Sequence, residues 1–249
     1  MIIALLKRRF WLWQNNIIST IAIILVLPII IFIMIDLSLK NILTRSLTGI
    51  PFDRWVFPGL IYIVASFSMI PSIFRDFFDL RIHNKVLVNV ALAPFSKNTI
   101  IFSYIIVAGL EAIFFSFIAT LIYLGFMPLP LTILQIIFMA FCLILYLNIL
   151  GNFILSISLI INSINNFILI ILMVTLFIVF GNGFIIEFGF FPNIIGFILE
   201  WQPLAIPYKT FQLYLTNGII EFTYIGFILI LSWIWILFNS FILKRKLGQ

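Results

Sequence analysis

Six long apolar runs, separated by short polar segments, constrain this chain more than any other feature. They cover residues 17–39, 55–74, 99–126, 131–161, 167–186 and 222–243. About 20 apolar residues in an α-helix are enough to cross the hydrocarbon core of a bilayer. Only 9% of the residues are charged, against about a quarter in soluble domains. The sequence therefore predicts an all-α integral membrane protein, with six transmembrane helices in one domain over residues 1–249.

The distribution of basic residues predicts the orientation. With six spans, both termini and residues 75–98 lie on one side, and that side carries ten of the fourteen Lys and Arg residues. Basic residues gather at the cytoplasmic ends of membrane helices. We therefore expect a multi-pass protein of the plasma (inner) membrane with both termini in the cytoplasm. The same bias explains the net charge of +6 without nucleic acid as a partner.

Two segments outside the six runs predict structure at the membrane surface. In residues 1–16, the basic run 7–9 is followed by Phe10, Trp11 and Trp13. This mixture is typical of an amphipathic helix that lies in the headgroup region. Residues 187–221 contain an apolar stretch too short to cross the membrane, which predicts a re-entrant or interfacial hairpin on the outer side between the fifth and sixth helices.

Residues 75–98 hold the chain's one histidine and several charges between two apolar runs. The middle of this cytoplasmic loop can form an amphipathic helix, with polar side chains at four-residue steps. It is either a contact surface for a partner or a solvated loop whose charge only fixes the topology. The residues that we expect at a partner contact are Arg75, Asp79, Arg81, His83 and Lys85.

Polar side chains inside the spans are the next candidates. Glu111 lies deep in the third run, and an intramembrane carboxylate normally faces the bundle interior or water. It either lines a route, pairs with a cation, carries a proton, or ties helices together as a protonated group. Asn148, Asn152 and Ser156 share one helical face. They either line a pathway or form hydrogen bonds between helices.

The sequence argues against an enzyme. One histidine and one cysteine, Cys142, do not make the usual zinc ligand set. The sequence contains no G-x-x-x-x-G-K-[ST] phosphate-binding loop, so any ATP is held by another chain. We expect no catalytic residue, metal or cofactor in this chain.

Three segments, taken in order, resemble the permeases of ABC-2 type transporters. WVFPGL at 55–60 resembles the family's FLxPGL, and the loop ending APFSK at 93–97 resembles its xxxPxS loop. The stretch from FFP at 190–192 to WQPL at 201–204 is similar to the family's FFP…PL pattern. Gln202 and Lys209 depart from the asparagine and arginine that are common there, which leaves the subfamily open.

The resemblance implies an ATP-binding cassette (ABC) exporter. Two copies, or this chain and a related permease, would pair and dock onto separate ATPase subunits that hold ATP and magnesium. The N-terminal helix and the loop at 75–98 would contact the ATPase. The cargo would be amphipathic or lipid-linked, as in exporters of lipo-oligosaccharides, polysaccharides or drugs.

In such an exporter the outer hairpin, with Phe191, Trp201 and Pro203, would cap the external side. Its aromatic side chains either contact substrate or form an interfacial belt. Two other classes of function stay open from the residues alone. One is a proton-coupled secondary transporter that uses Glu111, and the other is a structural membrane subunit of a larger complex.

Overall fold

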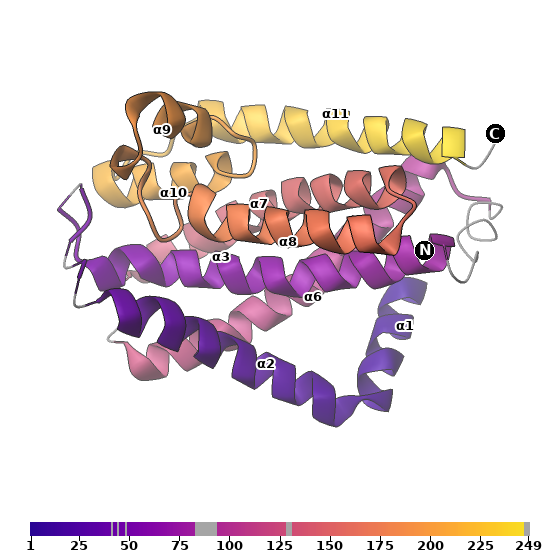
Figure 1. The fold of residues 1–249 in the computed structure, drawn as a ribbon, viewed down its shortest axis with the longest axis horizontal. Coiled ribbons are helices and arrows are strands. Elements are labelled where there is room, and N and C mark those ends of the chain that lie inside the picture. The colour runs from indigo at the N-terminus through magenta and orange to yellow at the C-terminus, as the bar shows by residue number, and fades with distance from the viewer. Residues whose placement is uncertain (41, 44, 48, 83–93, 128–130, 247–249) are drawn as a thin grey trace.

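The computed structural model describes residues 1–40, 42–43, 45–47, 49–82, 94–127 and 131–246. These residues are helical apart from turns, connecting segments and one isolated β-bridge. Among the described residues, six helices are long and apolar enough to cross a membrane. They cover Ile17–Leu37, Phe52–Asp79, Lys97–Phe126, Ile133–Ile160, Ile164–Gly181 and Phe222–Lys246. The N-terminus and the end of the last helix lie at the same end of the bundle (Figure 1).

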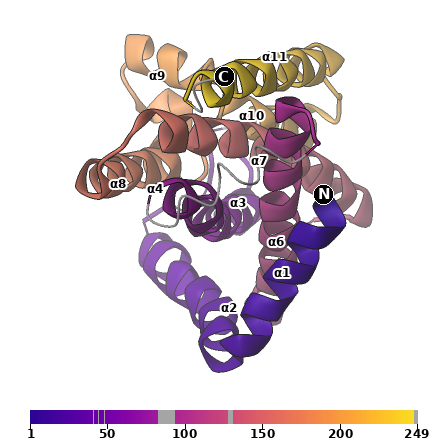
Figure 2. The same cartoon turned by 90° about the vertical axis from the view of Figure 1, so that its right-hand side faces the viewer.

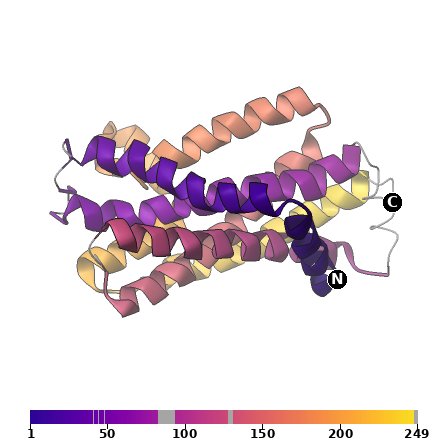
Figure 3. The ribbon, with the colours of Figure 1, turned by 90° about the horizontal axis from the view of Figure 1, so that it is seen from below.

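The first two helices meet at a sharp corner. Helix α1 (Ile2–Asn15) and helix α2 (Ile17–Ile31) are separated by Asn16, which has non-helical backbone angles. Figure 3 shows that α1 turns away from the long axis that α2 and the other spans follow. Pro28 lies within α2, and a π-helical turn, η1 (Phe32–Leu37), follows it. Proline has no N–H to donate and disturbs the regular helix.

Helix α3 (Phe52–Ile73) is the centre of the bundle, and most of its residues are buried. It packs against α6 (Lys97–Phe126) and α7 (Ile133–Ile160). The predicted end of this span at residue 74 is too early. The helix continues as a π-helical turn, η2 (Phe74–Asp79), and a short helix, α4 (Leu80–Ile82). It continues because Phe77 and Phe78 are fully buried there.

Local signals explain where the neighbouring helices begin. Ser96 caps α6 by accepting a hydrogen bond from the backbone of Thr99, and Thr132 with Gln135 forms a capping box at the start of α7. Helix α8 (Ile164–Gly181) ends before the predicted boundary at residue 186. Gly183 explains this, because its φ of 75° is a left-handed conformation that the helix cannot contain.

The end of the bundle opposite the termini is covered by short helices (Figure 1). These are η3 (Phe188–Phe190), α9 (Asn193–Glu200) and α10 (Ile206–Asn217), in the segment predicted as the outer hairpin. Helix α10 packs on α7 and buries Tyr208 and Phe211. The last helix, α11 (Phe222–Lys246), packs against α6 and α7.

Candidate functional site

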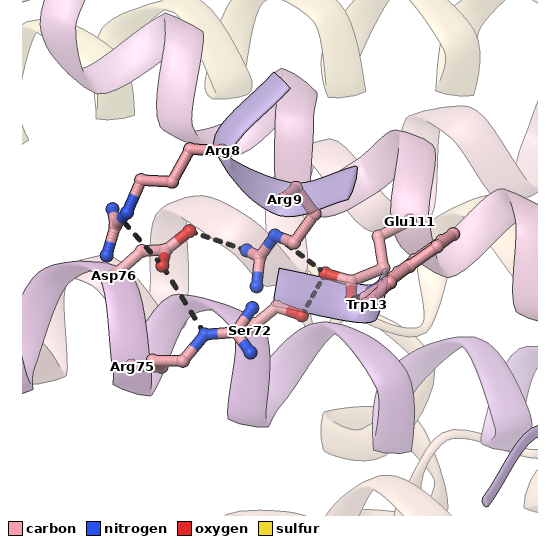
Figure 4. Close-up of polar contacts among 7 residues, drawn as sticks. All are labelled: Arg8, Arg9, Trp13, Ser72, Arg75, Asp76 and Glu111. Carbon is pink, nitrogen blue, oxygen red and sulfur yellow. Dashed lines mark hydrogen bonds and ion pairs between the residues drawn. The ribbon is translucent and has the colours of Figure 1, made fainter. Parts of the chain in front are cut away.

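A buried cluster of charges joins three helices near the N-terminal end of the bundle (Figure 4). Arg9 of α1 lies between two carboxylates. Its Nη2 is 2.5 Å from Oδ2 of Asp76 in η2, and its Nε is 3.1 Å from Oε2 of Glu111 in α6. The three side chains are only 5%, 9% and 8% exposed. Charges this far from water persist only when they are paired and hydrogen-bonded.

Neighbouring groups complete this cluster. Both oxygens of Glu111 have a partner, because Trp13 Nε1 donates to Oε1 at 2.9 Å and Ser72 donates to Oε2. Arg8 and Arg75 lie farther from Asp76 Oδ1, at 3.7 and 3.6 Å. We call these seven residues the charge cluster: Arg8, Arg9, Trp13, Ser72, Arg75, Asp76 and Glu111. It fastens α1 to the middle of α6 and to the end of α3.

The burial of Arg9 was not predicted. The sequence places Arg9 on a helix in the headgroup region, and the structure adds that its side chain is buried against other helices. The reason is that two buried carboxylates need a counter-charge, and Arg9 supplies it to both. The sequence missed Asp76 as a buried group, because it was assigned to a loop. The available signal was a carboxylate that directly follows a basic residue at the end of an apolar run.

The residues predicted to contact a partner lie in different surroundings. Arg75 is half-buried and turns toward Asp76, and Asp79 is half-buried at the end of η2. Arg81 donates from both Nη atoms to the carbonyls of Leu159 and Ile161 at the end of α7. His83 and Lys85 lie outside the described residues.

The predicted polar face of α7 is tied to α11. Asn239 donates to Asn152 Oδ1 at 3.2 Å, and Ser156 donates to Asn239 Oδ1 at 2.6 Å. Trp235 adds a bond from its Nε1 to Ser156 at 2.9 Å. The sequence analysis missed Asn239, although it is an amide within an otherwise apolar run. Asn148 is half-buried and lines a groove between α6 and α7.

At the opposite end, Lys209 holds the short helices together. Its Nζ is 2.8 Å from Glu200 Oε1 and 4.9 Å from the ring centres of Trp201 and Tyr224. A buried ammonium group is stabilised by a carboxylate and by aromatic faces. Trp201 is half exposed. Of the other predicted hairpin residues, Phe191 is partly exposed and Pro203 lines a cavity beside α8 and α11.

Glu187, in the connection after α8, links this end to the segment before α3. Its Oε1 accepts a hydrogen bond from the backbone N–H of Leu47 at 2.9 Å. Burial raises the pKa of Glu187 above its ordinary value of 4.5, and the bond from Leu47 opposes that rise.

We predict that Glu187 makes stability fall with rising pH. The folded chain keeps the Glu187 proton to a higher pH than the unfolded chain does. Its contribution is therefore full below the ordinary pKa of 4.5 and is lost as pH rises through the raised pKa. Glu187→Gln cannot ionise but can still accept from Leu47. Thermal unfolding should be measured for both proteins between about pH 4 and pH 8. The melting temperature of the variant should rise relative to that of the native chain as the pH increases. A difference in melting temperature that does not change with pH would contradict this prediction.

Comparison with known proteins decides the family. The model of the ABC-2 type transporter family matches residues 1–216, which include the whole charge cluster and the short helices through Thr216. The chain belongs to the ABC-2 type transporter family. Members of the ABC-2 family are the membrane permease components of ABC transporters, and they normally pair with an ABC ATPase subunit. No curated protein and no solved structure matches this permease.

Proposed function

We propose that this chain is the permease half of an ABC exporter for an amphipathic or lipid-linked substrate. A separate ATPase subunit binds ATP and magnesium, and the permease pairs with a second copy or a related chain. Membership of the ABC-2 family over residues 1–216 is the observation that carries the proposal. The excess of basic residues at the end with the termini supports a cytoplasmic position for that end.

The charge cluster supports a mechanical role for the same end. Arg9 binds α1 to Asp76 and Glu111, so α1, the end of α3 and the middle of α6 are held as one unit. Residues 83–93 connect α4 to α6 and carry His83 and Lys85. In the proposal, the ATPase subunit contacts this connection and moves it during ATP hydrolysis. Because the charge cluster holds α1, α3 and α6 together, this movement tilts the three helices as a unit.

The polar side chains of α7 divide between two roles. Asn152 and Ser156 are engaged by Asn239, which favours helix packing. Asn148 lies nearer the surface, in a groove of about 210 Å³ whose other lining is apolar. In the proposal, Asn148 is therefore the member of this set that faces an amphipathic substrate. Phe191, Trp201 and Pro203 form the external contact for that substrate.

A proton-coupled carrier is the weaker alternative. A carboxylate that takes up and releases protons must be able to lose its partners, but Glu111 is paired with Arg9 and accepts hydrogen bonds from Trp13 and Ser72. Transport that follows a pH gradient without ATP and is lost in Glu111→Gln would favour this alternative. A structural subunit would co-purify with a different enzyme and no ATPase.

The test is purification of the permease from its own host in mild detergent, followed by measurement of ATP hydrolysis. We expect a co-purifying ATPase whose activity is inhibited by vanadate. His83→Ala with Lys85→Ala should release it, whereas Lys244→Ala, which also removes one positive charge at pH 7, should retain it as a charge-matched control. Arg81 is left intact because it holds α7. Absence of any ATPase from the native sample would refute the proposal.

A further inference from the structure

A partly polar cavity of about 300 Å³ lies beside the charge cluster, between α1, α2, α3 and α6. Figure 2 shows the V formed by α1 and α2 at the side of α3 and α6. The volume is at the lower end of the range for small-molecule sites. It suits a compact polar group better than a whole lipid.

The cavity presents hydrogen-bond donors that the fold does not use. Ser68 lines the cavity and is only 8% exposed, and its hydroxyl has no hydrogen-bond partner among the residues that the structure describes. A buried hydroxyl without a partner is costly unless a ligand or water bonds to it. Asn16, Ser19 and Thr20 line the same cavity from the corner of α1 and α2.

The charge of the cavity favours an anion. In the charge cluster, three guanidinium groups face two carboxylates, so one positive charge is left over. Arg75 lines the cavity, its buried Nε makes no hydrogen bond, and its ion pair with Asp76 is long at 3.6 Å. Glu111 also lines the cavity, but its charge is balanced by Arg9 at 3.1 Å. Arg75 is therefore the cation that remains available to a ligand.

The surroundings of the cavity favour a lipid over a soluble anion. Apolar side chains, among them Leu12, Ile23 and Phe67, line the cavity together with the polar residues. Along α2, Ile18 and Ile21 are largely exposed on a helix long and apolar enough to cross the membrane. Such a surface accommodates acyl chains, while the guanidinium group matches the oxygens of a phosphate.

We propose that this cavity binds the phosphate of an anionic phospholipid from the leaflet around α1, with Arg75 as its counter-charge and Ser68 as a hydrogen-bond donor. The acyl chains lie outside the cavity along α2. The phosphate occupies the cavity at the corner of α1 and α2 and leaves the Arg9 ion pairs intact. This site does not depend on an ATPase or on transport.

The test measures lipid binding to the full chain, stripped of lipid in detergent, by native mass spectrometry. Phosphatidylglycerol should bind at one site. Phosphatidylcholine should bind at that site with at least tenfold lower affinity, because its choline group places a second cation beside Arg75. Glycerol phosphate tests whether the phosphate alone is sufficient, and it should bind far more weakly than the lipid.

Matched variants assign the binding to the cavity. Arg75→Gln should weaken phosphatidylglycerol binding about tenfold, the usual effect of losing a charge-assisted hydrogen bond. Arg8→Gln removes an equally exposed charge from the same carboxylate, with 38% exposure against 40%. Because Arg8 lies outside the cavity, this change should weaken binding much less than Arg75→Gln does. Ser68→Ala should weaken binding about fivefold without lowering stability, since no hydrogen bond within the protein is lost.

Three results would overturn the proposal. The first is that the native chain and Arg75→Gln bind phosphatidylglycerol with equal affinity. The second is that phosphatidylcholine binds as tightly as phosphatidylglycerol. The third is that glycerol phosphate binds as tightly as phosphatidylglycerol. None of them bears on whether an ATPase co-purifies, so the two proposals fail separately.

Discussion

Replacing Arg9 with glutamine should destabilise the permease by about 3 to 5 kcal/mol, the usual cost of removing one partner from a buried ion pair. Asp76 and Glu111 would lose their closest cation, which lies 2.5 and 3.1 Å away. Glutamine cannot replace a charge shared between two carboxylates. For a chain of this size, the melting temperature should fall by about 10 °C or more.

The buried thiol of Cys142 offers a direct readout of this loss. It is the chain's one cysteine and is fully buried, so a thiol-reactive fluorophore labels it only after unfolding. Arg8→Gln is the control, because its longer contact with Asp76 is partly exposed and contributes about 1 kcal/mol or less. The triple variant Arg9→Gln, Asp76→Asn, Glu111→Gln should recover most of the stability, since no buried charge remains unpaired. A triple variant as unstable as Arg9→Gln would show that shape, rather than charge, makes Arg9 important.

Replacing Gly59 with alanine should cost about 3 kcal/mol, at the upper end for overpacking a tight interior. A Cβ atom there would lie 2.2 Å from the carbonyl oxygen of Phe184. That oxygen belongs to the backbone, so α3 and the segment after α8 must separate. The same Cys142 labelling assay measures the effect.

Gly226 in α11 is the matched control for Gly59. A Cβ atom at Gly226 meets no heavy atom within 4 Å. Gly226→Ala should therefore stabilise the protein by about 0.5 to 1 kcal/mol through helix propensity. Equal effects of the two substitutions would contradict the close packing of α3 on Phe184.

The six apolar runs and the all-helical class were predictable because long apolar sequences have few alternatives in a membrane. The exact helix ends were not. The continuation of α3 past residue 74 depends on Phe77 and Phe78 being buried, and Phe78 lies against Phe167, 4.4 Å between ring centres, far away in the sequence. Contacts of this kind cannot be inferred from local hydropathy.

The candidate site was predictable only in part, for the same reason. Glu111 was recognisable because a carboxylate deep in an apolar run is unusual. Arg9 was not recognisable as its partner, because a basic residue beside tryptophans is typical of a surface helix. The link between Asn239 and Asn152 also required the three-dimensional arrangement of α7 and α11.

The charge cluster also constrains the order of events during synthesis. Arg9 leaves the ribosome early, but Asp76 follows 67 residues later, and the bond between Trp13 and Glu111 spans 98 residues. At about 5 to 20 residues per second, α1 waits roughly 5 to 20 s for Glu111 to emerge. During that interval the Arg9 guanidinium must stay hydrated at the membrane surface. Helix α1 can therefore dock fully only after α6 has been made, and its docking reports that α6 is in place.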